Sequence, residues 1–306
     1  MTVGMIGLGA LGRAMAERLV ATGEEVRAFD IDPQAMARLE TDLIAFEPDP
    51  RSLADRCDVL LSVVWDDAAL RQVVFGPDGV LASDSFAGCL IDLSTTSVAA
   101  AIAVGEAFDG REGAFLDGAV IGGGVPAAVA GQSPIVVAGD KAWFDRVAPV
   151  LSRLGGCEHV GPLGAAKTVK IVNNHLVGVL SAANAEAMSL GKSSGIEPDV
   201  LFEVLRKTRA SSFPLEAYFG RYLQEGRYGD GLIGHDLMHK DVSLAVDLAE
   251  TLDCPAPIAG IAQQFYLACS QGMGGRAPFP SSFDYLRRLA GDARPTPEHA
   301  SASPGG

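Results

Sequence analysis

The sequence predicts an α/β protein with a doubly wound parallel sheet, followed by an all-helical C-terminal domain. Strand-like and helix-like segments alternate from residue 1 to about 160, which is typical of a parallel sheet covered by helices on both faces. Strand signals end near residue 164, and an alanine-rich segment without proline then runs over 165–192. A glycine-rich turn lies at the first strand–helix junction.

Short apolar runs predict the strands, the last of which form an edge extension of the sheet. These strands are 2–6, 25–30, 43–46, 58–64, 89–92, 114–117 and 134–138. Helices are predicted at 10–22, 33–40, 50–55, 67–73, 97–107 and 141–152, and then at 165–192, 198–207, 213–224, 236–252 and 256–271. We therefore expect a sheet domain at 1–162 and a helical domain at 163–290, joined by one long helix. The Pro, Ala, Ser and Gly content of 291–306 predicts a disordered tail.

The glycine-rich turn has the G-x-G-x-x-G spacing, with Gly7, Gly9 and Gly12 at the junction of the first strand and the first helix. The first glycine allows a tight turn, the second lets the backbone approach a pyrophosphate, and the third lets the helix pack on the strand. The helix N-terminus offers N–H groups and a dipole that favour phosphate. The motif predicts a Rossmann-type dinucleotide site. Its candidate cofactor-binding residues are Gly7, Leu8, Gly9, Ala10, Leu11 and Gly12.

The second predicted strand ends at an acidic residue, Asp30, which lies eighteen residues after Gly12. A carboxylate at about this distance accepts hydrogen bonds from the adenosine ribose and repels a 2′-phosphate. Arg27 is expected on the strand and Arg38 on the following helix, so no arginine directly follows Asp30. We therefore expect NAD rather than NADP.

The composition indicates which binding partners and which cellular compartment to expect. The net charge is −14, which disfavours nucleic acid and anionic membranes. Five scattered cysteines without a C-x-x-C pair indicate reduced thiols and a cytoplasmic protein. The first predicted strand begins at residue 2, so no signal peptide is expected. No run of eighteen apolar residues suggests a membrane span. The apolar helical half favours a homodimer or homotetramer.

Four stretches, in order, resemble the β-hydroxyacid dehydrogenase family, which includes 3-hydroxyisobutyrate dehydrogenase and tartronate semialdehyde reductase. Residues 5–19 are similar to its G-L-G-x-M-G-x-x-M-A-x-x-L signature, with Leu11 where Met is usual. Residues 91–95 are similar to its D-x-S-T strand end, 117–124 to its D-A-P-V-S-G-G loop, and 161–174 to its G-x-G-x-x-x-K-x-x-N-N helix. The resemblance covers residues 1 to about 290.

The resemblance implies a role for several residues. Lys170 falls on the catalytic lysine, while Lys167, one turn earlier, is assigned no role. Asn174 shares a helix face with Lys170 at i,i+4, and is expected to join it in catalysis. The other implied cofactor contacts are Val64, Ser94, Thr95 and Lys240, the last from a segment at 236–245 in which Asp241 is a supporting acid. The implied substrate contacts are Ile121, Gly122, Gly123, Lys170, Asn173 and Asn174.

The substrate loop departs from the family pattern, because Ile121 stands where the family has Ser. A hydroxyl that would bond a substrate oxygen is replaced by an aliphatic group, whereas the backbone N–H groups of Gly122 and Gly123 still suit a carboxylate. We expect an NAD(P)-dependent oxidoreductase that interconverts a small β-hydroxy acid and its semialdehyde or keto acid. Hydride passes to or from the nicotinamide, and Lys170 donates or accepts the proton.

Four other functions are compatible with parts of the sequence. An imine reductase also has an Asp-Gly-Ala loop like Asp117-Gly118-Ala119, but usually carries another residue in place of Lys170. The related decarboxylating sugar-phosphate dehydrogenases have His in place of Asn173. A non-catalytic NAD(H)-binding module is expected to have lost the lysine. A metal enzyme would use His235 and His239 at i,i+4, but this pair has no evident third ligand, so no metal is expected.

Overall fold

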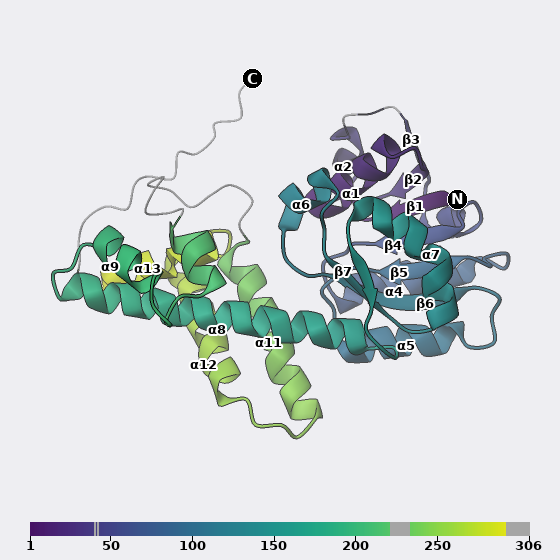
Figure 1. Cartoon of the computed structure of the whole chain (residues 1–306). Helices are drawn as coiled ribbons and strands as arrows, with labels where there is room; N and C mark the ends of the chain where they lie inside the picture. The colour runs from purple at the N-terminus through teal and green to yellow at the C-terminus, as the bar shows by residue number, and fades with distance from the viewer. Residues whose placement is uncertain (40, 42, 221–232, 292–306) are drawn as a thin grey trace. The chain divides into compact units, whose positions relative to one another are not determined.

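A computed structural model describes residues 1–39, 41, 43–220 and 233–291 of the chain (Figure 1). The predicted tail beyond Gly291 and residues 221–224 of the predicted helix 213–224 lie outside the described residues. Internal contacts divide the chain into two compact units, Met1–Asn173 and Asn174–Gly306. The division falls inside the long helix α8 (Ala165–Ser193).

The first unit is built on a mixed but mostly parallel sheet. In the described residues its strand order is β3-β2-β1-β4-β5-β6-β7-β8, and the only antiparallel pair of neighbours is β6 with β7. This order, with β1 between β2 and β4, is that of a doubly wound sheet, so the predicted fold class is confirmed. The strands are β1 (Thr2–Ile6), β2 (Glu25–Phe29), β3 (Ile44–Phe46), β4 (Val59–Ser62), β5 (Cys89–Asp92), β6 (Ala114–Val120), β7 (Ile135–Ala138) and β8 (Cys157–His159).

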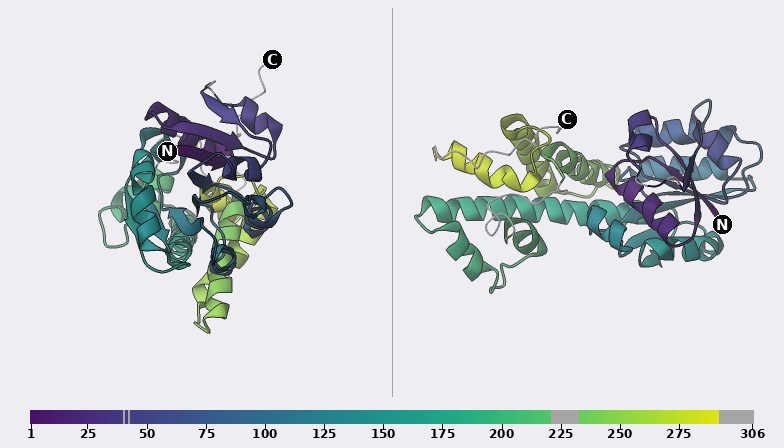
Figure 2. Two further views of the ribbon diagram at one scale, coloured as in Figure 1. Left: turned by 90° about the vertical axis from the view of Figure 1, so that its right-hand side faces the viewer. Right: turned by 90° about the horizontal axis from the view of Figure 1, so that it is seen from above.

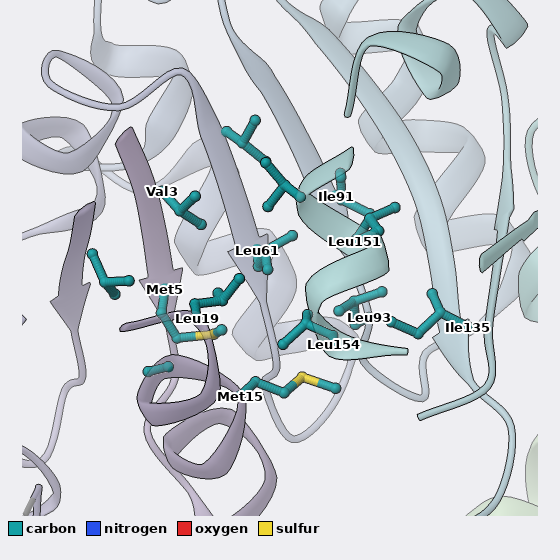
Figure 3. Close-up of a cluster of buried hydrophobic side chains, with 14 of the residues drawn as sticks. Val3, Met5, Met15, Leu19, Leu61, Ile91, Leu93, Ile135, Leu151 and Leu154 are labelled. Carbon is teal, nitrogen blue, oxygen red and sulfur yellow. The ribbon is translucent and has the colours of Figure 1, made fainter. Parts of the chain in front are cut away.

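Helices cover both faces of this sheet (Figures 1 and 2). They are α1 (Ala10–Ala21), α2 (Pro33–Ala37), α3 (Pro50–Ala54), α4 (Asp67–Phe75), α5 (Val98–Phe108), α6 (Gly124–Ala130) and α7 (Lys141–Leu154), with the 3-10 turn η1 (Val80–Ala82). Side chains alternate along each strand, so Met5 and Leu61 pack under α1 and α7 (Figure 3). Their neighbours Ile6 and Leu60 pack under α3, α4 and α5.

Three differences from the predicted elements have physical reasons. Strand β6 reaches Val120 instead of ending at residue 117, because its last residues pair with β7 after β5 has ended. Helix α6 begins at Gly124, the last of three successive glycines with positive φ, Gly122 to Gly124, where the sequence indicated a loop. Strand β8 was not predicted, because it has only three residues, none fully buried, and a run that short shows no periodicity.

The second unit is helical in its described residues. It contains the rest of α8, α9 (Pro198–Leu205), the π-helical turn η2 (Leu215–Phe219), α11 (His235–Thr251), α12 (Pro257–Met273), the turn η3 (Phe279–Ser281) and α13 (Ser282–Leu289), the last two not predicted. Gly178 lets α8 approach α11, because a Cβ there would lie 2.6 Å from Val242. Tyr266 of α12 donates a hydrogen bond to the Gly178 carbonyl at 2.8 Å. No described helix has the length and apolar content that crossing a bilayer requires.

A histidine lies in the core of the second unit. His235 begins α11 and is fully buried, with its Nε2 3.0 Å from the Ser281 hydroxyl. Burial lowers the pKa of His235 to about 4, and the charge of Asp236 opposes this shift only partly. Since an unfolded histidine titrates near 6.5, the folded state holds this ring neutral where the unfolded chain already takes up a proton.

Substitution of two glycines in the glycine-rich turn tests how tightly the turn packs. Gly12→Ala is expected to lower the free energy of unfolding by about 1–3 kcal/mol, because the new Cβ would collide with the Gly7 carbonyl oxygen. Gly9→Ala is the matched control, since a Cβ at Gly9 meets nothing within 4 Å and the backbone φ there is −57°. Denaturant unfolding of both variants measures this. Equal stability of the two variants would contradict the packing.

The second unit is expected to lose stability on mild acidification. Between pH 6.5 and pH 4 the unfolded state binds the His235 proton and the folded state does not, so stability falls as the pH falls. The full loss is up to about 3 kcal/mol, at about 1.4 kcal/mol per pKa unit. His235→Gln, which retains a polar group for Ser281, should flatten this part of the curve. Unfolding midpoints recorded across this range test it, and parallel curves for parent and variant would refute it.

Candidate functional site

The site of the first unit lies at the carboxyl ends of the parallel strands. Predicted residues lie just after four of these strands: Gly7 follows β1, Asp30 follows β2 and Ile121 follows β6 directly, and Ser94 lies two residues after β5. In doubly wound sheets, ligands bind at this edge where the strand order reverses. Here that reversal lies between β1 and β4.

The glycine-rich turn has the geometry of a phosphate cradle. Gly7 has a φ of +90°, and a Cβ there would collide with the Val63 carbonyl, so only glycine fits between β1 and β4. Gly9 caps α1 without a side-chain hydrogen bond and leaves its Cβ position open. The first turn of α1 therefore presents backbone N–H groups with no side chain in front of Gly9, as a pyrophosphate requires. The residues present fit a dinucleotide.

Asp30 is held against this turn. One carboxylate oxygen accepts a hydrogen bond from the Leu8 N–H at 2.6 Å, and the other accepts one from the Asp32 N–H at 2.8 Å. The carboxylate thus lies beside the glycine-rich turn. The two arginines considered above lie elsewhere: Arg27 pairs with Glu47, and Arg38 is the C-terminal cap of α2.

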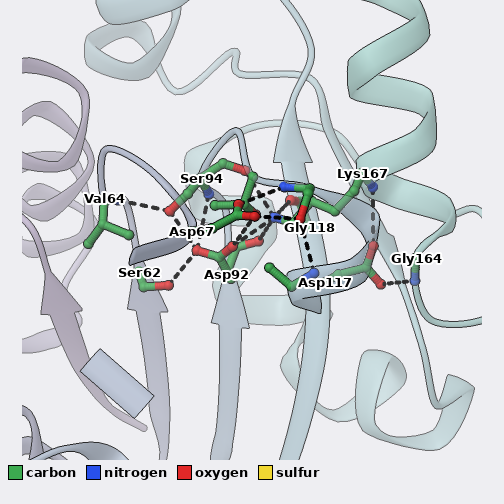
Figure 4. A network of polar contacts seen from close by, with 12 residues as sticks. Ser62, Val64, Asp67, Asp92, Ser94, Asp117, Gly118, Gly164 and Lys167 are labelled. Atoms are coloured by element: carbon green, nitrogen blue, oxygen red, sulfur yellow. Dashed lines mark hydrogen bonds and ion pairs between the residues drawn. The ribbon is translucent and has the colours of Figure 1, made fainter. Parts of the chain in front are cut away.

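A buried polar network links the ends of β4 and β5 (Figure 4). The Ser94 hydroxyl accepts a hydrogen bond from the Val64 N–H at 2.8 Å and donates one to Asp92 at 2.6 Å. Ser62 donates to the same carboxylate oxygen at 2.6 Å, and Thr96 donates to the other at 3.2 Å. Two predicted cofactor contacts, Val64 and Ser94, are therefore neighbours, and Thr95 lies between two residues whose side chains bond Asp92.

The centre of this network is Lys167, whose role sequence reasoning missed. Its side chain is fully buried, and its ammonium lies 2.9 Å from the Asp92 carboxylate. Burial alone would raise the pKa of Asp92, but the Lys167 charge and the hydrogen bonds of Ser62 and Ser94 outweigh it and hold that pKa below its usual value. The strand-end acid in the D-x-S-T stretch was the available signal, because a buried carboxylate requires a partner.

A second buried acid caps helix α8. The Asp117 carboxylate of β6 accepts hydrogen bonds from the backbone N–H groups of Gly164 at 3.0 Å and Lys167 at 3.1 Å. These are N–H groups that the start of a helix leaves without partners. Burial raises the pKa of Asp117, although these N–H groups and the Lys167 charge partly offset the effect.

Lys170 is placed one turn further along α8. Its half-buried ammonium donates a hydrogen bond to the Val120 carbonyl at 2.7 Å. The next residues, Ile121, Gly122 and Gly123, form the predicted substrate loop, in which both glycines are exposed and have positive φ. The structure thus brings the candidate lysine to the beginning of the candidate substrate loop.

Three other predicted residues, Asn173, Asn174 and Lys240, lie further along the chain, on α8 and α11. Asn173 follows Lys170 by three residues on α8 and ends the first unit. In the second unit, Asn174 is buried and donates a hydrogen bond from Nδ2 to Asp241 at 2.8 Å. Lys240 lies 4.0 Å from the same carboxylate. Asp241 therefore supports Asn174 directly within the second unit.

The histidine pair is not part of a metal cluster in the described residues. His235 is a buried core residue bonded to Ser281, as described above. In the described part of the chain, no group of three or more His, Cys, Asp or Glu side chains is arranged to hold a metal ion.

Comparisons with known proteins agree with a dinucleotide site in the first unit. Residues 2–161 match the family model of the NAD-binding domain of 6-phosphogluconate dehydrogenase. Residues 164–283 match that of the NAD-binding domain of NADP-dependent 3-hydroxyisobutyrate dehydrogenase. Among curated relatives, 2-(hydroxymethyl)glutarate dehydrogenase of Eubacterium barkeri is 31% identical over 90% of this chain and 89% of its own length. The 3-hydroxyisobutyrate dehydrogenase of Pseudomonas aeruginosa is 31% identical over 86% and 90%, respectively.

A solved structure of a hydroxyacid dehydrogenase is also similar to this chain. That of Mycobacterium tuberculosis 3-hydroxyisobutyrate dehydrogenase with L-serine superposes with a TM-score of 0.83 at 27% identity, and the match covers 94% of this chain and 99% of that one. Together with the sequence matches, this shows a nicotinamide-dependent oxidoreductase that acts on CH–OH groups. The chain belongs to the β-hydroxyacid dehydrogenase family.

Proposed function

We propose that Lys170 is the acid–base group of an NAD-preferring dehydrogenase for small β-hydroxy acids. One observation carries the proposal: the Lys170 ammonium is half-buried and bonded to the Val120 carbonyl, directly before the loop of Ile121, Gly122 and Gly123. A hydrogen bond to a fixed backbone oxygen orients the side chain, and general acid–base catalysis requires such a fixed orientation.

The cofactor would be held by the glycine-rich turn, and Asp30 supports the preference for NAD. The first turn of α1 would face the pyrophosphate, and the Asp30 carboxylate would accept hydrogen bonds from the ribose hydroxyls. Val64, Ser94 and Thr95 would line the nicotinamide end, and Lys240 is proposed as a further contact from its sequence match. The bound nicotinamide supplies or accepts the hydride.

The protein would supply position and a proton. In reduction, Lys170 would donate a proton from Nζ to the carbonyl oxygen of the substrate, and in oxidation it would accept the hydroxyl proton. The backbone N–H groups of Gly122 and Gly123 would bind the carboxylate, as anion-binding loops of this conformation do. Asn173 and Asn174 would orient the substrate, and the bond from Asn174 to Asp241 supports a fixed amide.

Ile121 bears on the substrate class. Relatives are named for 3-hydroxyisobutyrate, 2-(hydroxymethyl)glutarate and L-threonate, hydroxy acids whose substituents range from a methyl group to a carboxyethyl chain and further hydroxyl groups, so the proposal on the substituent rests on Ile121. With an aliphatic side chain in place of the family serine, we propose a β-hydroxy acid with an apolar substituent. Initial rates with NAD⁺ and a panel of hydroxy acids, with a cyclic imine and NADH as the comparison, test this function. Activity with the imine alone would contradict it.

We also propose a homodimer or homotetramer in the cytoplasm. Large apolar side chains of the second unit are exposed, among them Leu176, Leu190 and Ile261, and association would cover them. All five cysteines are free thiols, which fits a reducing compartment.

Lys170→Ala should lower kcat by about 10²- to 10⁴-fold, the range that acid–base groups contribute. Binding of NADH, followed by its fluorescence, should stay close to that of the parent, because the glycine-rich turn is untouched. Lys192→Ala is the matched control on the same helix, since the Lys192 ammonium pairs with Glu197. Near-normal turnover of Lys170→Ala would refute the assignment.

Asp30→Asn should reduce the preference for NAD over NADP by about tenfold or more, since two like charges near a protein surface repel by about 1–4 kcal/mol. Asparagine keeps an oxygen for the Leu8 N–H, so the turn is preserved. Asp32→Asn, which alters the N-cap of α2, is the control. The ratio of kcat/KM values for the two cofactors is the measurement, and an equal change in both variants would contradict a specific role for Asp30.

A further inference from the structure

The buried ammonium of Lys167 has more oxygen partners than it has protons. It donates to the carbonyl oxygens of Asp92 at 2.8 Å, Ser94 at 2.9 Å and Gly118 at 2.8 Å, and also lies 2.9 Å from the Asp92 carboxylate. An ammonium has three N–H donors, so its four acceptors surround it completely. The group is thereby fixed in place, and it also fixes the two chain segments that supply the oxygens.

These oxygens come from the two segments next to the candidate reaction centre. Asp92 and Ser94 end β5 and begin the loop that carries Thr95, while Gly118 lies in β6 two residues before Val120. Asp92 is paired with Asp117, so β6 runs beyond β5 from Gly118 onward. The N–H of Ile121 bonds Pro134 on the β7 side, and the carbonyls of Gly118 and Val120 therefore point to the opposite side.

Two lysines of α8 occupy this unpaired edge of β6. Lys167 bonds the Gly118 carbonyl and Lys170 bonds the Val120 carbonyl, so lysines three residues apart on the helix meet carbonyls two residues apart on the strand. The position of Lys170 along β6 consequently depends on how the preceding turn of α8 is held against the sheet. The Lys167 side chain holds that turn through the Gly118 carbonyl, and the Asp117 carboxylate holds it by accepting a hydrogen bond from the Lys167 N–H.

We propose that Lys167 and Asp92 form a positioning pair, which holds Lys170 at Val120 and Ser94 at Val64 in the geometry that hydride and proton transfer require. The inference rests on the function proposed above for Lys170. Neither member touches a substrate in this scheme, because both are fully buried. A buried ion pair is a costly way to obtain stability alone, since apolar replacements of similar volume are often at least as stable. A geometric role accounts for it.

Two variants test the pair, and each removes the charge of one of its two members. Lys167→Gln replaces the ammonium with a neutral amide, and Asp92→Asn keeps the shape of the acid while it removes its charge. Lys141→Gln is the control in the same unit, because Lys141 forms an exposed pair with Asp145. Should Lys167→Gln be insoluble, Asp92→Asn decides the question, because it leaves the three carbonyl contacts of Lys167 available.

The first measurement needs neither cofactor nor substrate. Hydrogen exchange of the apoenzyme, followed by mass spectrometry, should become faster in peptides that cover 93–97 and 118–121 in both variants, with 2–6 and 25–29 unchanged. Uniformly faster exchange would show global destabilisation, and unchanged exchange would show that the pair fixes nothing. Either result overturns the proposal, whatever substrate the enzyme uses.

The second measurement is kinetic, with a hydroxy acid that the parent enzyme oxidises. We expect kcat to fall about 10- to 100-fold, as for a displacement of reacting groups by about 1 Å, while KM for NAD⁺ stays near the parent value. The deuterium isotope effect on kcat, with substrate labelled at the carbinol carbon, should rise as hydride transfer becomes slower. A smaller fraction of folded enzyme would lower kcat without a change in the isotope effect, and that result, or an unchanged kcat, would overturn the proposal.

The two proposals fail in distinguishable ways. A parent enzyme that oxidises no hydroxy acid would refute the proposed function, and the exchange experiment would still test whether the pair fixes these segments. An active parent with Lys167→Gln and Asp92→Asn variants of equal activity would refute the positioning role alone.

Discussion

The unpaired edge at the end of β6 is the constraint on which the site depends. Strand β6 continues to Val120 after β5 has ended at Asp92, and this leaves the carbonyls of Gly118 and Val120 without a neighbouring strand. Buried carbonyl groups need donors. Helix α8 supplies them from Lys167 and Lys170. The position of the candidate acid–base group thus follows from an ordinary requirement of backbone hydrogen bonding.

The remaining polar network follows from the charge of Lys167. An ammonium with no exposed surface requires a counter-charge, and Asp92 supplies it. That carboxylate in turn takes hydrogen bonds from Ser62 and Ser94, and Ser94 accepts the N–H of Val64. One buried charge therefore fixes the ends of β4 and β5, where the nicotinamide end of the cofactor is proposed to lie. The glycine-rich turn, held by Asp30, is organised separately at β1 and β2.

The sequence predicted best what is local in the chain. The strand, the three glycines and Asp30 lie within thirty residues, and their spacing specifies both the turn and the side on which the acid lies. Lys170 was identified through a motif of similar length. Lys167 was assigned no role, because its partners are 73 and 75 residues away in the sequence and are brought to it only by the packing of α8 on the sheet. The extension of β6 was missed for the same reason, because β7 and not the local pattern decides where β6 ends.

In the proposed function, Lys170 exchanges a proton with the substrate while it is held at the end of β6. A crystal structure of the enzyme with NAD⁺ and a β-hydroxy acid that it oxidises tests this most directly. We expect Nζ of Lys170 to lie about 3 Å from the substrate hydroxyl and to keep its hydrogen bond to the Val120 carbonyl. A hydroxyl bonded to a different acid–base group, with Lys170 turned away from it, would refute this role of Lys170.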